Sequence, residues 1–469
     1  MLAAPWSFPV AGSPGSKDPG PTRAITLAEA RPVLAALGDG VPSGLRDLRG
    51  PDADARWSDW LKGRDADIRR RIGTGDEDSV VNLMLYGTSF TRWPRATPAA
   101  VAASGSNARL EDVMDGRVAD LSTAIESPGA DERLRFARGV VERNGIAIGA
   151  ASRAATRRYL VKLRSRVLSD NERYIRRLAA VPLADPSQQR AAQATLYRDR
   201  GLSSDTSLRV AFALEQTLEA LRDRGELGGR PVERVAVVGP GLDFVDKAQG
   251  YDFYPVQTIQ PFAVADSLRR LGTAARPTVT TLDISRRVIA HLREARQRAA
   301  QGQAYRVHAV LEQDSAAARL DPALVAYWRR FGDRVGSQTA SEIPAAYAGQ
   351  VRSRTIDVRP DAVLDVTGTE SNIVLERLSS ADPSSRFDMV VATNVLVYYD
   401  TFEQALAVGN MASMLREGGL LVTNQPVPVP AACGVSPVLI MSVGFDRVQS
   451  EAGPHERGDS IFVYRKTAS

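Results

Sequence analysis

The sequence predicts a doubly wound α/β sheet that is preceded by an all-helical domain. Helical periodicity dominates from Thr26 to about residue 228, and strand-like alternation is scarce there. After Gly229, short apolar runs begin with 234–238 and alternate with helical stretches, a pattern typical of parallel sheets with helical crossovers. The 469 residues are ample for two or three domains. We expect a flexible lead-in at 1–25, a helical domain at 26–228 and an α/β domain at 229–469, with insertions at 246–261 and 314–350.

The composition is that of a soluble globular protein, with 43% hydrophobic and 25% charged residues and a net charge of +5. No apolar run reaches eighteen residues, which excludes a membrane-spanning helix of ordinary length. The apolar start is broken by Pro5 and Pro9 and has no basic region before it, so it is a poor signal peptide, and we expect a cytoplasmic protein. One cysteine and three histidines cannot supply a Cys/His zinc cluster, and no metal site is expected.

The helical half divides into segments with apolar residues at helical spacing. The first begins with Thr26 and Glu29, whose spacing is that of a capping box. We expect helices at Ala28–Leu37, Ala55–Ile72, Leu110–Ile125, Asp131–Ala151, Ser152–Ala180, Ser187–Tyr197 and Ser204–Arg224.

The stretch 152–181 carries nine basic residues against Asp170 and Glu172. Such a helix can bind nucleic acid, an acidic partner or a membrane surface. The interpretation we favour is a solvated face that pairs with nearby acids, because no nucleic-acid module accompanies it.

The α/β half is a series of strand-like runs separated by helices. We expect strands at Arg234–Val238, Thr278–Leu282, Tyr305–Leu311, Met389–Val397, Leu420–Asn424, Val438–Val443 and Ile461–Tyr464, with helices at Ser285–Ala300, Ile373–Ser379 and Thr401–Leu415. Within the insertion 314–350, an aromatic-rich helix is expected at Leu320–Phe331. The insertion is either a wall of a binding pocket or an elaboration that packs on the sheet.

A glycine turn follows the first strand of this half. Gly239 and Gly241 allow a backbone to approach a ligand at the carboxyl edge of the sheet, where open α/β sheets bind nucleotides and adenosyl groups. The third glycine of a dinucleotide fingerprint is absent, and no Lys-Ser or Lys-Thr pair follows as a P-loop requires. A tight structural turn is the competing interpretation.

The next strand ends in Asp283. A carboxylate at this position can accept two hydrogen bonds from vicinal ribose hydroxyls. The alternative is an N-cap, because Asp283 and Ser285 both suit the start of the following helix.

A third signal comes from residues 386–400, the helix that follows, and the Glu-Gly-Gly turn that leads into 420–424. In this order of strand, helix, turn and strand, the chain from Arg234 to Arg465 resembles the class I S-adenosylmethionine-dependent methyltransferases, which have a Rossmann-like sheet. Residues 392–400 are locally similar to the chemotaxis-receptor glutamate methyltransferases.

The resemblance implies S-adenosylmethionine as cofactor. It implies that Gly239 and Gly241 line the methionine portion, that Asp283 holds the ribose, and that the pair Asn372 and Ile373 lies against the adenine. Thr393 and Asn394 then approach the cofactor from the end of the fourth strand. The sequence departs from the family pattern in the lost third glycine, in the lack of an acidic residue before the turn, and in Thr393, which replaces an arginine.

Three residues are candidates for the catalytic step. Asn394 is placed to hold the acceptor, and Tyr398, with Tyr399 beside it, to flank the methyl group and exclude water. Tyr254, or Gln257, can orient the acceptor if the insertion 246–261 folds over the cofactor, whereas packing against the sheet is the competing role of these rings.

The function that we expect is methyl transfer to an unidentified acceptor, a small molecule or a protein ahead of nucleic acid. No general base is evident, and a carboxylate acceptor needs none because it is already anionic at neutral pH. The alternatives are a nicotinamide-dependent oxidoreductase, which Asp283 favours and the missing glycine disfavours, and a cofactor-binding regulator without turnover.

Overall fold

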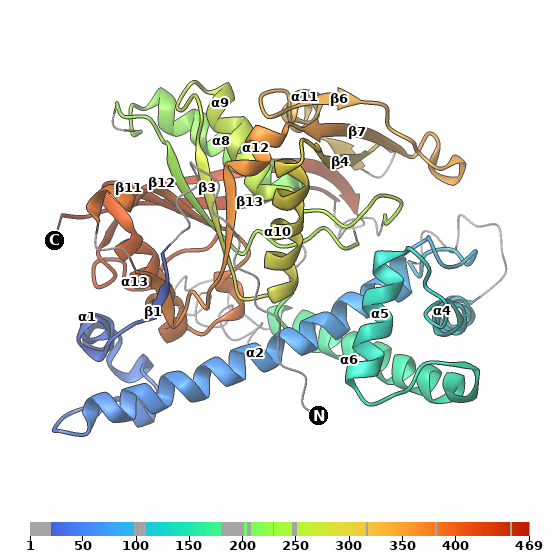
Figure 1. Cartoon of the computed structure of the whole chain (residues 1–469), viewed down its shortest axis with the longest axis horizontal. Coiled ribbons are helices and arrows are strands. Elements are labelled where there is room, and N and C mark those ends of the chain that lie inside the picture. Colours follow the sequence, from blue (N-terminus) through green and yellow to red (C-terminus); the bar gives the residue numbers. More distant parts are fainter. Residues whose placement is uncertain are drawn as a thin grey trace.

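The computed structural model describes residues 20–97, 101, 109–179, 201–203, 208–227, 229–245, 251–315, 318–379, 382–450 and 453–468. The lead-in up to residue 19, the expected helix at Ser187–Tyr197 and the start of the insertion at 246–250 lie outside these ranges. The molecule is a mixed α/β structure in which a large twisted sheet is covered by helices, with further helices along one side (Figure 1).

The main sheet has eight strands among the described residues, in the order β5-β12-β13-β11-β10-β2-β3-β8. Its parallel part is β8-β3-β2-β10-β11, and the strand that follows β11 in the sheet, β13, runs antiparallel to it. The strands are β2 (Arg234–Val238), β3 (Thr278–Asp283), β5 (Ala318–Leu320), β8 (Val366–Glu370), β10 (Phe387–Ala392), β11 (Leu415–Thr423), β12 (Val435–Ser450) and β13 (Gly453–Lys466).

Helices cover both faces of this sheet, because side chains along each strand point alternately to opposite faces. In β2, Val235 and Val237 belong to one hydrophobic cluster, while Ala236 and Val238 belong to another. The first cluster takes its helical residues from α8 (Leu208–Asp223), α9 (Gln260–Arg270), α10 (Arg286–Ala300) and α12 (Pro360–Leu364), among others. The second takes them from α1 (Leu27–Leu37), the first turns of α2 (Ala53–Tyr86) and α13 (Thr401–Met414). The expectation of a doubly wound sheet is confirmed.

Three expectations for the α/β half are wrong, one of them in part. The strand expected at Met389–Val397 is β10, which ends at Ala392, and Leu396–Tyr398 forms a 3-10 helix instead. The strand expected at Tyr305–Leu311 exists as β4 (Tyr305–Glu312), but it belongs to a separate antiparallel sheet with β7 (Val351–Val358) and β6 (Gly336–Thr339). The helix expected at 373–379 is absent; this segment contains β9 (Glu376–Leu378), which pairs with β1 (Thr22–Ala24). The third parallel strand, β8, was not expected, because its sequence Val-Thr-Gly-Thr-Glu is polar and does not form an apolar run.

The insertion 314–350 forms several short elements between β4 and β7. These are β5, α11 (Pro322–Arg330), β6 and the 3-10 helix η4 (Ala345–Tyr347). Strand β5 pairs with β12 at the edge of the main sheet, and the indole of Trp328 in α11 donates to the carbonyl of Ala309 in β4. In these contacts the insertion packs on the two sheets.

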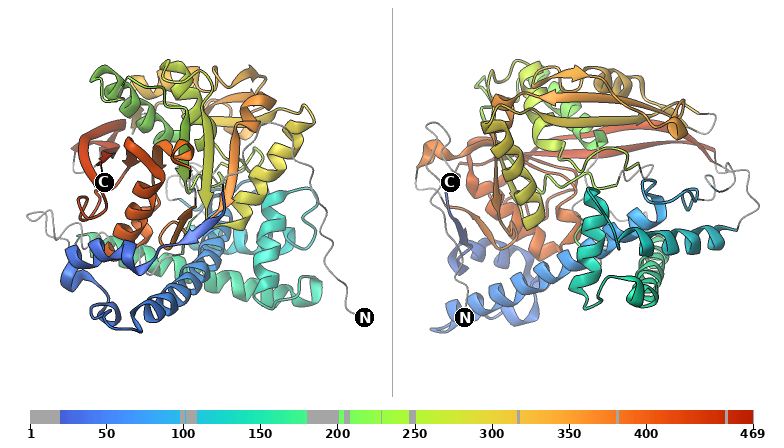
Figure 2. Two further views of the ribbon diagram at one scale, coloured as in Figure 1. Left: turned by 60° about the vertical axis from the view of Figure 1, so that its left-hand side comes forward. Right: turned by 45° about the vertical axis from the view of Figure 1, so that its right-hand side comes forward.

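The helical half contains α1, α2, α4 (Leu110–Ala124), α5 (Glu132–Arg143), α6 (Arg153–Ala179) and α8, with 3-10 helices η1 (Gly38–Gly40), η2 (Ser43–Leu45) and η3 (Ala150–Ser152). The capping box of Thr26 and Glu29 is present at the start of α1. Helix α2 does not end at Ile72 but continues to Tyr86, and it runs along one side of the α/β part, with α4, α5 and α6 gathered at its far end (Figures 1 and 2). Both hydrophobic clusters contain residues from before and after residue 229.

Candidate functional site

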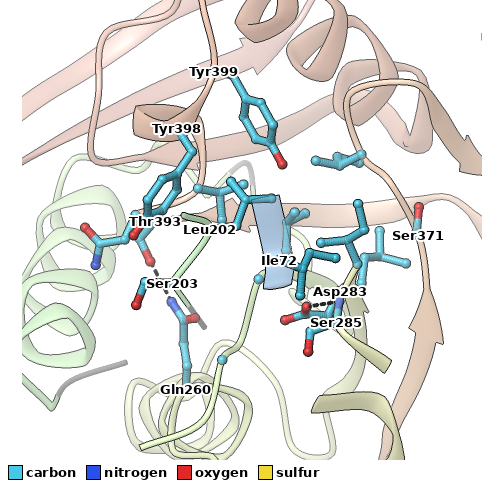
Figure 3. Close-up of a pocket in the computed structure, with 18 of the residues that line it drawn as sticks. Ile72, Leu202, Ser203, Gln260, Asp283, Ser285, Ser371, Thr393, Tyr398 and Tyr399 are labelled. Carbon is cyan, nitrogen blue, oxygen red and sulfur yellow. Dashed lines mark hydrogen bonds between the residues drawn. The ribbon is translucent and has the colours of Figure 1, made fainter. Parts of the chain in front are cut away.

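A pocket lies at the carboxyl edge of the parallel strands. It is centred on β2, whose two neighbours β3 and β10 are reached by crossovers in opposite directions. Such a switch point is where open α/β sheets bind their ligands. The lining residues are Ile72, Asp76, Leu202, Ser203, Val238, Gly239, Gly241, Gln260, Leu282, Asp283, Ile284, Ser285, Ser371, Ile373, Thr393, Asn394, Val395, Tyr398 and Tyr399 (Figure 3).

The glycine turn after β2 forms one part of this lining. Gly239 and Gly241 both have φ of 64°, a left-handed conformation that favours glycine. A Cβ atom on Gly239 would lie 2.6 Å from Cγ2 of Val395, so the opposite wall approaches the turn closely. The glycines are therefore required by the backbone and by the contact across the pocket.

Asp283 ends β3 beside this turn and is only 7% exposed. Its Oδ1 accepts a hydrogen bond of 2.7 Å from the backbone N–H of Ser285. Burial raises the pKa of Asp283 to about 6, although the backbone N–H groups of Ser285 and Gly241 and the charge of Arg287 act in the opposite direction. No capping bond is formed by Ser285, and the Asp283 carboxylate faces the pocket (Figure 3).

Residues 371–373 follow β8 on the same edge of the sheet. Ser371 donates its backbone N–H to the carbonyl of Asp283, and its side chain is 2% exposed. Its hydroxyl has no hydrogen-bond partner among the described residues, which is uncommon for a buried polar group. Ile373 lines the pocket, whereas Asn372 points elsewhere and donates through Nδ2 to Asp65 of α2.

Residues 393–399, between β10 and α13, form the wall opposite Asp283. The hydroxyl of Thr393 accepts a hydrogen bond of 2.7 Å from Nε2 of Gln260, the first residue of α9 (Figure 3). Asn394 lines the mouth of the pocket and is exposed. Tyr398 lies in the 3-10 helix η6 (Leu396–Tyr398), and the next residue, Tyr399, is buried, which raises the pKa of its hydroxyl.

Tyr254 lies outside this pocket. Its ring is buried with Tyr251 and Val351, and its hydroxyl donates to Oδ1 of Asp243. Gln257 also donates to Asp243 and exchanges hydrogen bonds with the backbone of His308. The structure therefore places Tyr254 and Gln257 against β4, whereas Gln260, near the end of the insertion, lines the pocket.

The histidines do not supply a base at this site. His291 contacts the hydroxyl of Tyr305, and His308 contacts that of Thr355. Burial lowers the pKa of both imidazoles to about 4. Neither residue lines the pocket.

Helix α2 covers the pocket, a feature that the sequence did not indicate. Ile72 and Asp76 form a wall together with Leu202 and Ser203. The helix is tied to the edge of the sheet by polar contacts with the segments that follow β8 and β10 and with α13. These contacts are Arg69 to Glu370 at the end of β8, Asp65 to Asn372, Arg71 to the carbonyl of Tyr398, and Arg64 to Glu403 of α13. The cavity left between the walls has a volume of about 70 Å³.

The basic helix α6 forms ion pairs along its length. Arg153 binds Glu126, Arg164 binds Asp115, and Arg166 binds Asp78. These pairs agree with a face that is neutralised by nearby acids.

The described residues contain no cluster of three or more His, Cys, Asp or Glu side chains that could hold a metal ion. None of their helices is both long and apolar enough to cross a membrane.

Comparisons with known proteins give low-level likeness to methyltransferase structures. No family model matches the chain, and no curated protein matches it. The N-methyltransferase NodS from Bradyrhizobium japonicum WM9 is 14% identical with a TM-score of 0.25, covering 55% of this chain and 97% of NodS. Magnesium protoporphyrin IX methyltransferase from Synechocystis PCC 6803, solved with bound S-adenosylmethionine, is 12% identical with a TM-score of 0.26, covering 63% and 91%. TrmN from Thermus thermophilus is 13% identical with a TM-score of 0.26, covering 59% and 52%.

Proposed function

We propose that the protein is an S-adenosylmethionine-dependent methyltransferase that transfers a methyl group to an acceptor still to be identified. The observation that carries the proposal is the buried carboxylate of Asp283 at the end of β3, beside the left-handed turn of Gly239 and Gly241. A carboxylate in this place suits a ligand with vicinal hydroxyls, and the glycines suit a ligand that contacts the backbone.

The residues present fit an adenosyl cofactor. Asp283 would accept hydrogen bonds from the ribose hydroxyls, and Ile373 would contact the adenine, near the unpartnered hydroxyl of Ser371. Gly239 and Gly241 would line the methionine portion. When bound, the cofactor supplies an electrophilic methyl group on a sulfonium.

The space for such a ligand is restricted by α2. Pockets for ligands of this size measure about 300 to 1,000 Å³, whereas the cavity measures about 70 Å³. Ile72 and Leu202 belong to the wall that limits this space. Entry of the cofactor therefore requires a shift of α2 or of residues 201–203.

The sheet does not favour the nicotinamide alternative. In a dinucleotide-binding sheet, the sixth parallel strand follows the fifth, but here the antiparallel β13 lies beside β11. The position of the third fingerprint glycine is occupied by Phe244, which is buried. Close packing of a helix against the turn, the role of that glycine, is not possible with this side chain.

The chain's own groups hold and shield the acceptor in this proposal. Tyr398 and Tyr399 close one side of the pocket against water, and Gln260 fixes the hydroxyl of Thr393. The ionisable side chains that line the pocket are Asp76, Asp283 and these two tyrosines. With Asp283 engaged by the ribose, an acceptor that is already anionic would need no base from the pocket.

Calorimetric titration with S-adenosylmethionine and S-adenosylhomocysteine tests the proposal. Micromolar binding is expected, with a loss of at least tenfold in the Asp283→Asn variant, because the hydrogen bonds to a charged acceptor are worth about 1.5 to 3 kcal/mol each. Asp112→Asn, on the exposed face of α4, is the matched control and should bind normally.

Three results would contradict parts of the proposal. Absence of binding by folded wild-type protein would overturn it. Binding of NAD in place of the adenosyl ligands would favour the oxidoreductase. Binding without transfer of a radiolabelled methyl group to any candidate acceptor in a broad screen would favour a regulator.

A further inference from the structure

The wall of residues 393–395 depends on the backbone conformation of its middle residue. Asn394 has φ of 59°, one of two non-glycine residues with positive φ in the described part of the chain. On one side of it, Thr393 meets Gln260 across the pocket. On the other side, Val395 lies against the turn at Gly239. A change in the conformation of Asn394 would therefore displace both contacts.

The side chain of Asn394 is bound to Asn424, the residue that follows β11. The backbone N–H of Asn394 donates to Oδ1 of Asn424 at 2.8 Å, and Nδ2 of Asn424 donates to Oδ1 of Asn394 at 2.8 Å. The carboxamide of Asn424 thus binds both the backbone and the side chain of Asn394. Left-handed conformations are disfavoured for L-residues, and Asn adopts them when its side chain finds a local partner.

Asp459 fixes the orientation of the Asn424 amide. Nδ2 of Asn424 donates to Oδ2 of Asp459 at 3.2 Å, and the other oxygen of Asp459 accepts the N–H of Ser460 at 2.9 Å. An ionised carboxylate only accepts hydrogen bonds, so the NH₂ end of Asn424 must face it. The carbonyl end of Asn424 is then presented to the N–H of Asn394.

We propose that Asn424 and Asp459 are positioning residues, which hold Asn394 in its left-handed conformation and thereby place Thr393 and Val395 on the cofactor pocket. This inference rests on the proposed function. It changes the role expected for Asn394: its carboxamide serves the conformation of the turn, and the contribution to the ligand comes from its two neighbours. Through β13, the strand that carries Asp459, the antiparallel part of the sheet contributes to the site.

A double-mutant cycle tests the positioning role in the full-length protein. Glycine adopts positive φ without penalty, so Asn394→Gly removes the need for Asn424. Asn424→Ala alone should weaken S-adenosylhomocysteine binding by about tenfold. In the Asn394→Gly background, the same substitution should weaken it by no more than about threefold. Urea unfolding of the same four proteins should show the same coupling without any ligand, and Asn144→Ala, at the end of α5, is the control amide.

The outcomes separate the inference from the proposed function. A wild-type protein that is folded but does not bind S-adenosylhomocysteine overturns the proposed function and, with it, the role at the cofactor site. If the wild type binds, equal losses from Asn424→Ala in both backgrounds overturn the inference alone. Coupling in urea without any change in binding overturns it too, because the turn would then matter for stability and not for the pocket.

Discussion

Replacing Asp283 by asparagine should stabilise the ligand-free protein while it abolishes most of the ligand binding. The carboxylate is almost fully buried, and its pKa rises from 3.8 to about 6. At about 1.4 kcal/mol per tenfold change in proton affinity, the ionised form is disfavoured in the folded protein by about 3 kcal/mol. Loss of one backbone hydrogen bond in the variant costs about 1 kcal/mol. The expected gain at pH 8 is therefore about 2 kcal/mol.

The pH dependence has a defined sign. Well below pH 3.8, the ordinary pKa of an aspartate, Asp283 is protonated in both the folded and the unfolded chain and contributes no difference. Between about pH 4 and 6, the folded protein keeps a proton that the unfolded chain has released, so this group lowers stability as the pH rises. Above about pH 6 the full penalty is present. The advantage of the asparagine variant should therefore grow from pH 4.5 to pH 8.

Urea unfolding of both proteins at pH 4.5 and pH 8 measures this difference. Binding should follow the opposite trend, because ribose hydroxyls donate to the ionised carboxylate: the affinity of the wild type for S-adenosylhomocysteine should fall as the pH drops from 7 to 5. A variant that is equally destabilised at both pH values would refute the reasoning, since the carboxylate would then be well satisfied without a ligand.

Two further predictions concern the walls of the pocket. Gly239→Ala should lower the affinity for S-adenosylhomocysteine at least tenfold, as measured by calorimetry, because the new Cβ would meet Val395 at 2.6 Å in a left-handed turn; normal binding would show that this wall is free to move. A Ser371→Cys variant supplies a thiol in the pocket whose labelling rate reports an opening of α2. Adding Glu370→Gln to this variant removes the ion pair with Arg69 and should speed the labelling severalfold. Raising the salt concentration to about 0.5 M should speed the labelling of the Ser371→Cys single variant in the same way, because salt screens the ion pair. The native Cys433 gives little background, because burial raises the pKa of its thiol to about 12; a labelling rate unaffected by either change would argue against an opening of α2.

Much of the fold could be predicted because its signals are local. The apolar run of β2 and the helical spacing of α10 and α13 each predict one element. Strand β8 was not predicted because its sequence is polar. Strand β4 was assigned to the main sheet because its apolar pattern does not distinguish one sheet from the other. Pairing partners are set by contacts distant in sequence, which periodicity does not contain.

The candidate site also contains residues that the sequence could predict and residues that it could not. Gly239, Gly241 and Asp283 stand at strand ends, where the topology brings them to one edge, and they do line one pocket. Tyr254 was a poor candidate because an aromatic residue in a loop gives no direction for its ring. Ile72 could not be found at all, because it is one apolar residue among several on a long helix.

The cover over the pocket explains why the two halves of the sequence share their cores. Helix α2 contributes Ile72 to the pocket, and its charged residues bind loops that follow β8 and β10. A helix held only by exposed ion pairs would be weakly fixed, since such pairs are worth less than about 1 kcal/mol each. Here the start of the same helix buries Trp57 under the sheet, with its indole N–H bound to the carbonyl of Ile25. The helix is thus anchored by buried apolar residues at both of its ends and tied by polar contacts at the pocket.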